Sequence, residues 1–119
     1  MKKKILVMDD QADFLELVKH RLENHDYEVM TAHDGVEGLQ LAKKEGPDLI
    51  LLDVKMANMD GYTTLLRLRQ DEKTKAVPVV VLTAYEGMRD LFRLEGVDDF
   101  IVKPFDDKDF ISRIARVLK

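Results

Sequence analysis

Charged and hydroxyl side chains stand directly after apolar runs at four places in the chain. Two carboxylates, Asp9 and Asp10, follow ILVM, and a third, Asp53, follows LILL. The run VPVVVL precedes the hydroxyl of Thr83, and FIV precedes the ammonium of Lys103. Apolar runs of this length are typical of buried strands, and α/β proteins place their chemistry at the carboxyl ends of parallel strands. The five side chains could therefore meet at one edge of a sheet.

These residue types together predict a site for phosphoryl transfer. Three carboxylates repel one another unless a hard cation neutralises them, and Mg²⁺ prefers oxygen ligands and commonly joins carboxylates to phosphate. Ca²⁺ would need more ligands and a dedicated loop, and the spacing of an EF-hand is not present. A carboxylate nucleophile, a divalent cation, an ammonium and a hydroxyl are the parts of a phosphoryl-transfer site. We expect Lys103 to pair with Asp53 at rest and with a phosphoryl oxygen later.

A simpler interpretation exists for each acid taken alone. An aspartate at the end of a strand more often caps the following helix or lies in solvent. For Asp9 and Asp10 by themselves, capping of the first helix is the better interpretation. The complete set of five residues in the right order reverses that preference.

Two patterns alternate along the chain and indicate the elements that would carry these residues. Segments with apolar residues at helical spacing, such as Phe14, Leu15, Val18 and Leu22, separate five short β-rich runs. Five β/α repeats predict an open, doubly wound parallel sheet of flavodoxin-like order 2-1-3-4-5 with five helices. In that order the first and third strands are neighbours, so their terminal aspartates should meet. The predicted strands cover residues 4–8, 27–31, 48–53, 77–82 and 99–102.

Composition narrows the class of protein. A length of 119 residues predicts a single domain over 1–119, and contents of 45% hydrophobic and 35% charged residues are typical of globular proteins. A formal charge of −4 gives no electrostatic case for direct contact with nucleic acid. The chain has no cysteine, which excludes disulfides and thiolate metal sites. No apolar run is long enough for a membrane span or a signal-peptide core, so we expect a cytoplasmic protein without membrane contact.

Four segments together resemble the receiver domain of the response regulators of bacterial two-component systems. They are MDD (8–10), LLDVKM…MDG (51–61), LTA (82–84) and FIVKPF (100–105), and the resemblance covers the whole chain. It implies that Asp53 is the phosphoacceptor, which takes a phosphoryl group from a histidine kinase, a phosphotransfer protein or a small phosphodonor. It also implies a Mg²⁺ ion held by Asp9, Asp10, Asp53 and the backbone carbonyl of Lys55.

The same resemblance implies which residues contact the phosphoryl group and respond to it. Thr83 and Lys103 would contact its oxygens, and a cis peptide bond before Pro104 would aim the lysine inward. Phe100 resembles the aromatic switch residue, which moves inward when Thr83 shifts. The output would then be a changed surface on the last α/β units, offered to an unknown downstream protein or effector domain. The resemblance implies that the chain is not an enzyme and catalyses only its own phosphorylation and dephosphorylation.

Three departures from the family pattern give further expectations. Ala57 stands where proline is usual, and we expect the site to form nonetheless. The 20 residues from Thr83 to Lys103 are about two fewer than the family has, which predicts a short, mobile fourth helix. The large side chains of Lys55 and Tyr85 could crowd the path of a hydrolytic water, which predicts slow self-dephosphorylation.

Two other classes of protein have features in common with this sequence. A phosphorylation-independent interaction module with the same fold remains the alternative, and Ala57 and the short helix favour it mildly. A haloacid-dehalogenase-like phosphatase needs an acid where Lys55 stands, and a flavodoxin needs a phosphate loop where Asp9 and Asp10 would repel phosphate. A stand-alone regulator and a domain of a longer protein are both compatible with the sequence.

Overall fold

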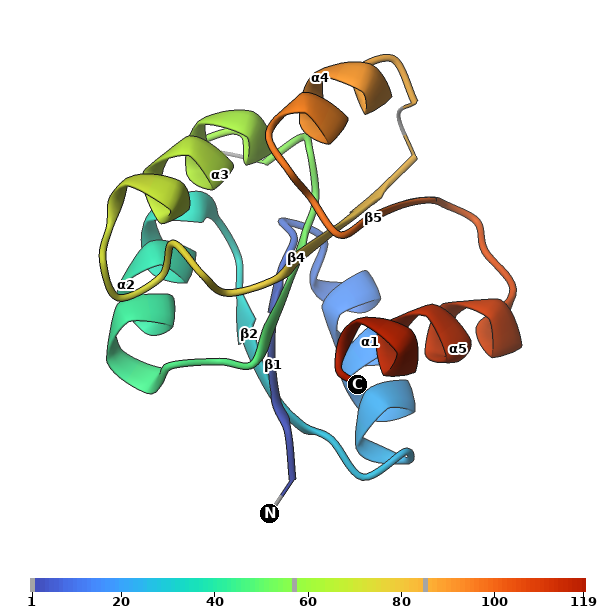
Figure 1. Ribbon diagram of the computed structural model, residues 1–119. Coiled ribbons are helices and arrows are strands. Elements are labelled where there is room, and N and C mark those ends of the chain that lie inside the picture. Colours follow the sequence, from blue (N-terminus) through green and yellow to red (C-terminus); the bar gives the residue numbers. More distant parts are fainter. Residues whose placement is uncertain (1, 57, 85) are drawn as a thin grey trace.

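Five parallel strands form one sheet in the order β2-β1-β3-β4-β5, and five helices cover it (Figure 1). This is a computed structural model, which describes residues 2–56, 58–84 and 86–119. The order and the helix count confirm the predicted flavodoxin-like architecture. The elements are β1 (Lys4–Met8), α1 (Ala12–Glu23), β2 (Glu28–Ala32), α2 (Gly35–Glu45), β3 (Leu49–Leu52), α3 (Gly61–Gln70), β4 (Val79–Thr83), α4 (Arg89–Leu94), β5 (Asp99–Val102) and α5 (Asp107–Val117).

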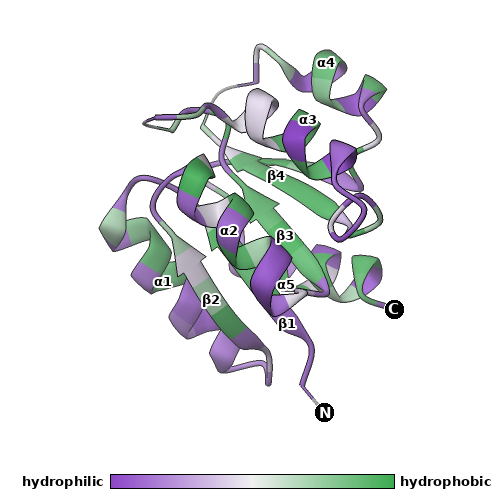
Figure 2. Cartoon of the chain, turned by 90° about the vertical axis from the view of Figure 1, so that its left-hand side faces the viewer, coloured by the Kyte–Doolittle hydropathy of each residue, from purple (hydrophilic) through white to green (hydrophobic). Residues whose placement is uncertain are grey.

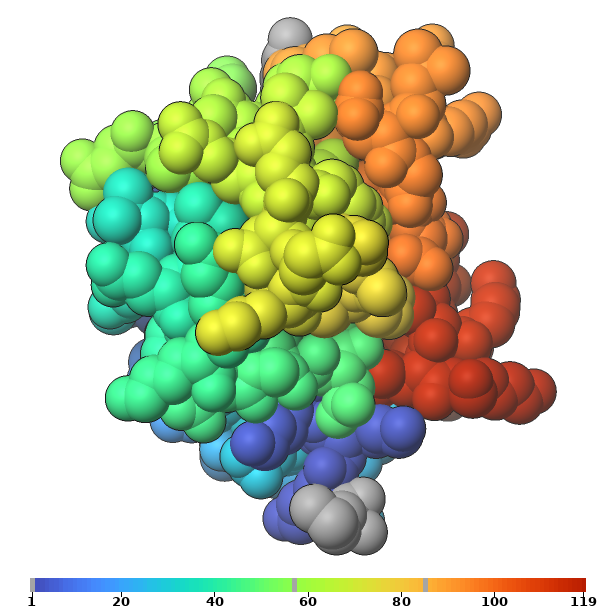
Figure 3. Space-filling view, turned by 60° about the vertical axis from the view of Figure 1, so that its left-hand side comes forward, coloured from blue at the N-terminus to red at the C-terminus, as the bar shows by residue number. Residues whose placement is uncertain are grey.

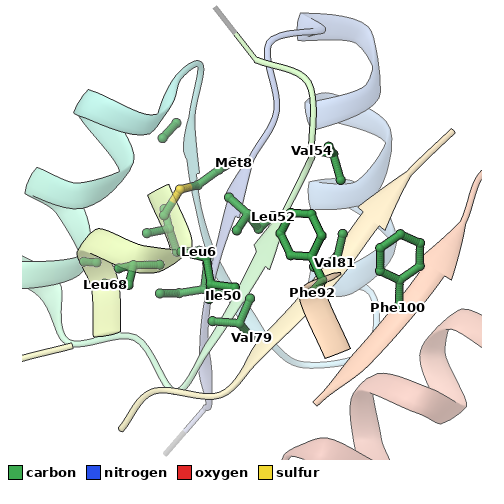
Figure 4. Packing of buried hydrophobic residues seen from close by; sticks show 13 residues of the cluster. Leu6, Met8, Ile50, Leu52, Val54, Leu68, Val79, Val81, Phe92 and Phe100 are labelled. Carbon is green, nitrogen blue, oxygen red and sulfur yellow. The ribbon is translucent and has the colours of Figure 1, made fainter. Parts of the chain in front are cut away.

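Alternate side chains of each strand enter two separate apolar cores. Leu6 and Met8 of β1 face a core with α2, α3 and α4, whereas Ile5 and Val7 face a core with α1 and α5. Figure 4 shows the first core, and Figure 3 shows its outer face, where α3 and the segment after it lie between α2 and α4. Helices on both faces explain why the central strands read as continuous apolar runs.

Hydropathy along the sheet agrees with this layering. β3 is apolar along its whole length and β4 is apolar up to its last residue, Thr83, whereas the edge strand β2 carries polar residues (Figure 2). β1 and β5 have the predicted bounds, and the ends of β2, β3 and β4 differ from the predicted runs by one or two residues. β3 ends at Leu52, and the next residue, Asp53, lies just beyond the strand.

Aspartate side chains cap the first turns of α2 and α3. The side chains of Asp34 and Asp60 accept hydrogen bonds from the N–H groups of Glu37 and Thr63 and so cap α2 and α3. Gly46 ends α2 in the left-handed conformation at φ 58°.

The fourth helix, α4, is the shortest of the described helices. α4 has six residues, whereas the other helices have 10 to 12. This confirms the predicted shortening between Thr83 and Lys103. No helix in the described part of the chain has the length and apolarity that a bilayer crossing requires.

Candidate active site

The three carboxylates predicted to meet lie together at the carboxyl edge of the sheet. β1 and β3 pair in a register that sets Met8 beside Leu52, so the residues that follow them are neighbours. The N–H of Asp53 donates to the carbonyl of Met8 at 3.0 Å, which extends the ladder by one residue. One carboxylate oxygen from each of Asp9, Asp10 and Asp53 lies within 4.8 Å of the others.

The carboxylates of Asp9 and Asp10 differ sharply in burial. Asp9 is 1% exposed and accepts a hydrogen bond from the N–H of Gln11 at 2.9 Å, whereas Asp10 is exposed. Helix α1 begins at Ala12 with Gln11 as its N-cap, so neither aspartate is the cap residue of this helix. The structure therefore gives no support to the simpler interpretation of the pair as helix caps.

Asp53 is a buried carboxyl group in a mixed electrostatic environment. It is 8% exposed, and Oδ1 accepts the N–H of Val54 at 2.8 Å. Burial raises the pKa of Asp53 above its ordinary value, and the charge of Asp9 adds to this effect. The ammonium of Lys103, a hydrogen bond from the hydroxyl of Thr83 and the N–H of Val54 act in the opposite direction. Burial and the like charge of Asp9 therefore favour the neutral carboxyl group of Asp53, whereas Lys103 and the two hydrogen bonds favour its charged form.

The ammonium of Lys103 does not pair with Asp53 as expected. Its Nζ lies 2.7 Å from Oδ2 of Asp9, in an ion pair whose side chains are 14% and 1% exposed. Asp9 is the most deeply buried of the three acids, so it gains most from a neighbouring cation. The peptide bond between Lys103 and Pro104 is cis, as predicted.

Thr83 and Lys55 complete the lining of the site. The backbone N–H of Lys103 donates to the carbonyl of Thr83 at 2.7 Å, which holds the ends of β4 and β5 together. Lys55 has an exposed side chain and follows Asp53 in the loop after β3. A pocket of about 390 Å³ is lined by Asp10, Gln11, Asp53, Lys55, Thr83, Ala84 and Lys103. The pocket opens to solvent beside the acidic cluster, so a small phosphorylated molecule has access to Asp53.

Phe100 lies inside the molecule, at some distance along β5 from the pocket. Its ring is 9% exposed and packs against Phe92 of α4, with ring centroids 6.1 Å apart (Figure 4). The guanidinium carbon of Arg89, at the start of α4, lies 5.2 Å from the centre of the same ring. In this structure the expected switch residue therefore occupies the inward position, with the short α4 above it.

The site has the chemistry of a hard-cation and phosphate site. Carboxylate oxygens are the ligands that Mg²⁺ prefers, and the three acids provide them within reach of one another. Among the described residues, no other cluster of three His, Cys, Asp or Glu side chains has this geometry. Ala57 and Tyr85, on which two of the expectations above depend, lie outside the described residues.

One contact of the site was not foreseen. The ring of Phe14, in the first turn of α1, has its centre 3.7 Å from Nζ of Lys103. In the sequence Phe14 belongs to the apolar stripe of a helix, and nothing in that pattern tells it from the leucines beside it. The position of Phe14 at the start of this stripe, one helical turn after Asp10, is the one feature of the sequence that could have indicated the contact.

Comparison with known proteins agrees with this geometry. The family model described as the response regulator receiver domain matches residues 5–115. The DNA-binding dual master transcriptional regulator RpaA of Synechocystis is 39% identical over 118 residues, which are 98% of this chain and 49% of RpaA. Response regulator PleD of Caulobacter vibrioides is 41% identical over 123 residues, which cover 100% of this chain and 27% of PleD. The chain thus spans about half of RpaA and about a quarter of PleD.

Solved structures with the same fold cover 99% of the chain. Chemotaxis protein CheY4 of Vibrio cholerae superposes with a TM-score of 0.91 at 32% identity, over 99% of this chain and 100% of CheY4. The receiver domain of sensor histidine kinase PA1611 from Pseudomonas aeruginosa gives 0.91 at 26% identity, over 99% and 98% of the two chains. That domain was solved with a magnesium ion coordinated in its active site cleft.

Proposed function

Since the chain belongs to the response regulator receiver domain family, we propose that it is a switch that accepts a phosphoryl group on Asp53 in a Mg²⁺-dependent reaction. The observation that carries the proposal is the meeting of three carboxylates, an ammonium and a hydroxyl around one solvent-open pocket. We take residues 1–119 as a single receiver domain, whether it acts alone or within a longer protein.

The proposed nucleophile is a carboxylate oxygen of Asp53. It forms a bond to phosphorus while the bond from phosphorus to the imidazole nitrogen of a phosphohistidine breaks, and the electron pair of that bond stays on the nitrogen. With a small acyl phosphate the leaving group is the carboxylate of the acid. A histidine kinase or a phosphotransfer protein is the proposed donor. The position of Asp53, buried but lining the pocket, supports this role.

The acidic cluster fits the cation that such a reaction needs. Asp9, Asp10 and Asp53 would hold Mg²⁺ together with the backbone carbonyl of Lys55, a residue that lines the same pocket. When bound, Mg²⁺ supplies positive charge that offsets the negative charge of the phosphoryl oxygens and of the three acids. The receiver domain of PA1611, with its magnesium ion, supports this assignment by analogy.

Thr83 and Lys103 are the proposed contacts of the phosphoryl oxygens. A phosphoryl group on Asp53 adds about −1.5 to −2 charge and three strong acceptors. The Thr83 hydroxyl already donates to Asp53, and the Lys103 ammonium lies beside Asp9, so both are within the same small volume. Their response would bias Phe100 and the last two α/β units between two packings. The proposed output is a changed surface for a downstream protein or effector domain.

The other expected properties stay predictions. We expect no direct contact of these residues with nucleic acid or membrane and a location in the cytoplasm. Beyond its own phosphorylation and dephosphorylation, we expect no enzymatic activity. RpaA is a DNA-binding regulator, but this chain spans only 49% of it.

Mass spectrometry of the intact protein tests the proposal. Incubation with Mg²⁺ and acetyl phosphate should give a single phosphoryl adduct on the wild type and none on Asp53→Asn. Asp34→Asn, at the cap of α2, is a matched control and should keep the adduct. The absence of an adduct on the wild type, with the fold intact, would overturn the proposal and favour the phosphorylation-independent interaction module.

A further inference from the structure

The ammonium of Lys103 lies between a carboxylate and an aromatic ring. Its Nζ is 2.7 Å from Oδ2 of Asp9 and 3.7 Å from the centre of the Phe14 ring. The usual range for a cation–π contact extends to about 6 Å, so the ammonium is well within it. The Lys103 side chain is 14% exposed, which removes most of the water that would weaken such a contact.

Other rings hold the Phe14 ring in place. Phe14 meets Phe105 edge to face, with centroids 6.3 Å apart and an interplanar angle of 81°. Phe105 in turn packs on Phe110 of α5 at 4.8 Å, and Phe110 is completely buried. The face that Phe14 offers to Lys103 is thus fixed by the core between α1 and α5.

We infer that Phe14 is a positioning residue for the proposed phosphorylation, in which its ring face holds the Lys103 ammonium beside the pocket. This inference rests on the proposed function of Asp53. Phe14 does not contact the reacting atoms in this role. It acts through Lys103, which lines the pocket with Asp53 and Thr83.

The reason lies in the two demands on Asp9. The same carboxylate that pairs with Lys103 is one of the three acids that fit Mg²⁺. Once the charge of Asp9 is directed to a divalent cation, its attraction for the ammonium falls. The lysine stem has four flexible carbons and would then lose its fixed position. The negative face of the Phe14 ring carries no such competing role, so it keeps the ammonium at the pocket wall.

A purely structural role for Phe14 makes a different prediction. If the ring only fills space between α1 and α5, shape and volume matter and the charge distribution of the ring does not. Fluorination separates the two, because it withdraws electron density from the ring face with little change in size. We therefore propose to replace Phe14 with mono-, di- and trifluorophenylalanine and to measure the rate of adduct formation with acetyl phosphate and Mg²⁺.

The expected result is a rate that falls by a roughly constant factor with each fluorine and reaches about threefold to tenfold below wild type. The same three fluorinated phenylalanines in place of Phe110, which packs on Phe105 and does not line the pocket, should leave the rate unchanged. A flat rate across the Phe14 series would overturn the inference.

A second readout does not depend on phosphorylation. The ring of Phe14 should shift the ε-methylene proton resonances of Lys103 upfield, and Phe14→Leu should abolish that shift. In wild type the shift should persist when Mg²⁺ is added. Loss of the shift on addition of Mg²⁺ would overturn the inference, because the ammonium would then have left the ring.

The two proposals fail in different ways. A wild type that never forms the adduct overturns the function of Asp53, whatever the resonances of Lys103 show. A wild type that forms the adduct at a rate indifferent to fluorine at position 14 overturns only the role of Phe14.

Discussion

Nζ of Lys103 lies 2.7 Å from Oδ2 of Asp9, whose side chain is 1% exposed. Each of these two charges stabilises the other, because a buried ion that loses its partner still carries the cost of having left water. The lysine is therefore the internal counter-ion of the acidic cluster. Any divalent cation that binds Asp9 has to share or replace this interaction.

When a chelator keeps Mg²⁺ away, Lys103→Met should lower the free energy of unfolding by about 1 to 3 kcal/mol. The loss is smaller than for a fully buried ion pair, because this site borders an open pocket. Addition of Mg²⁺ should restore much of the loss, since the cation takes over the neutralisation of Asp9. Urea unfolding with EDTA and with Mg²⁺ measures both values. Arg113→Met, which removes the partly exposed ion pairs with Asp99 and Asp109, is the control and should show no rescue. Equal losses with and without Mg²⁺ would contradict this picture.

Asp53→Asn should be more stable than wild type at neutral pH in the absence of Mg²⁺. Burial, followed by the charge of Asp9, raises the pKa of Asp53 above its ordinary value of 3.8. The folded state then binds the proton more tightly than the unfolded chain. The contribution of Asp53 to stability is therefore fully present below pH 3.8 and is lost as the pH rises through the folded value. The neutral asparagine avoids that loss.

Unfolding in urea with EDTA at a series of pH values from about 4 to 7 measures the difference between the two proteins. The advantage of Asp53→Asn should shrink as the pH falls toward 4. Asp34 is the matched control, because the N–H of Glu37, followed by the side chain of Asn58, lowers its pKa. Its contribution has the opposite sign, so Asp34→Asn should lose stability at neutral pH. A loss of stability for Asp53→Asn at pH 7 would refute the prediction.

The sequence predicts the fold and the members of the site better than it predicts their contacts. Apolar runs and turn residues are local signals, so the order of elements and the meeting of Asp9 with Asp53 follow from them. The partner of Lys103 does not follow, because three acids converge and only their relative burial selects Asp9. Phe14 reaches Lys103 through the packing of α1 beside the end of β5, which no local pattern encodes.

The short α4 should open locally more easily than the sheet beneath it. A helix of six residues has little stability of its own, so its contacts hold it in place. The hydroxyl of Tyr62 on α3 donates to Glu95 at 2.9 Å, and the Tyr62 ring meets Phe92 edge to face at 5.5 Å. Tyr62→Phe removes the hydrogen bond and keeps the ring, and should weaken the closed state by about 0.5 to 1.5 kcal/mol.

Amide hydrogen exchange measures this effect. The N–H of Phe92, bonded to the carbonyl of Met88, should exchange roughly twofold to tenfold faster in Tyr62→Phe. The N–H of Ile50 in β3 should not change. Uniformly strong protection over residues 86–95 in the wild type would contradict the expectation of a mobile fourth helix.

Loss of the phosphoryl group should be slow because of the side chains around the line of attack. Lys55 lines the same pocket as Asp53 and Thr83, whereas Tyr85 lies outside the described residues. Lys55→Ala and Tyr85→Ala should each speed the decay of the adduct by about threefold or more, since a hydrolytic water gains access. Mass spectrometry after removal of acetyl phosphate gives the rates. Unchanged decay in both variants would rule out crowding as the cause.

Gly61 fixes the backbone that carries the proposed phosphoacceptor. Its N–H donates to the carbonyl of Val54 at 2.7 Å, and a Cβ at this position would collide with the carbonyl oxygen of Asp53. Gly61→Ala must therefore move the loop after β3, at a cost of about 1 to 3 kcal/mol. Because small displacements of a nucleophile are costly, adduct formation should slow by about tenfold or more.

Gly38→Ala is the matched control for this effect. The three atoms nearest to a Cβ at Gly38 all belong to the side chain of Met8, so this substitution displaces a core side chain, whereas Gly61→Ala meets the backbone of Asp53. Gly38→Ala should lose some stability and keep the rate of adduct formation. If Gly61→Ala lost stability to the same extent as Gly38→Ala and still reacted at the wild-type rate, the close approach of α3 would have no role in placing Asp53.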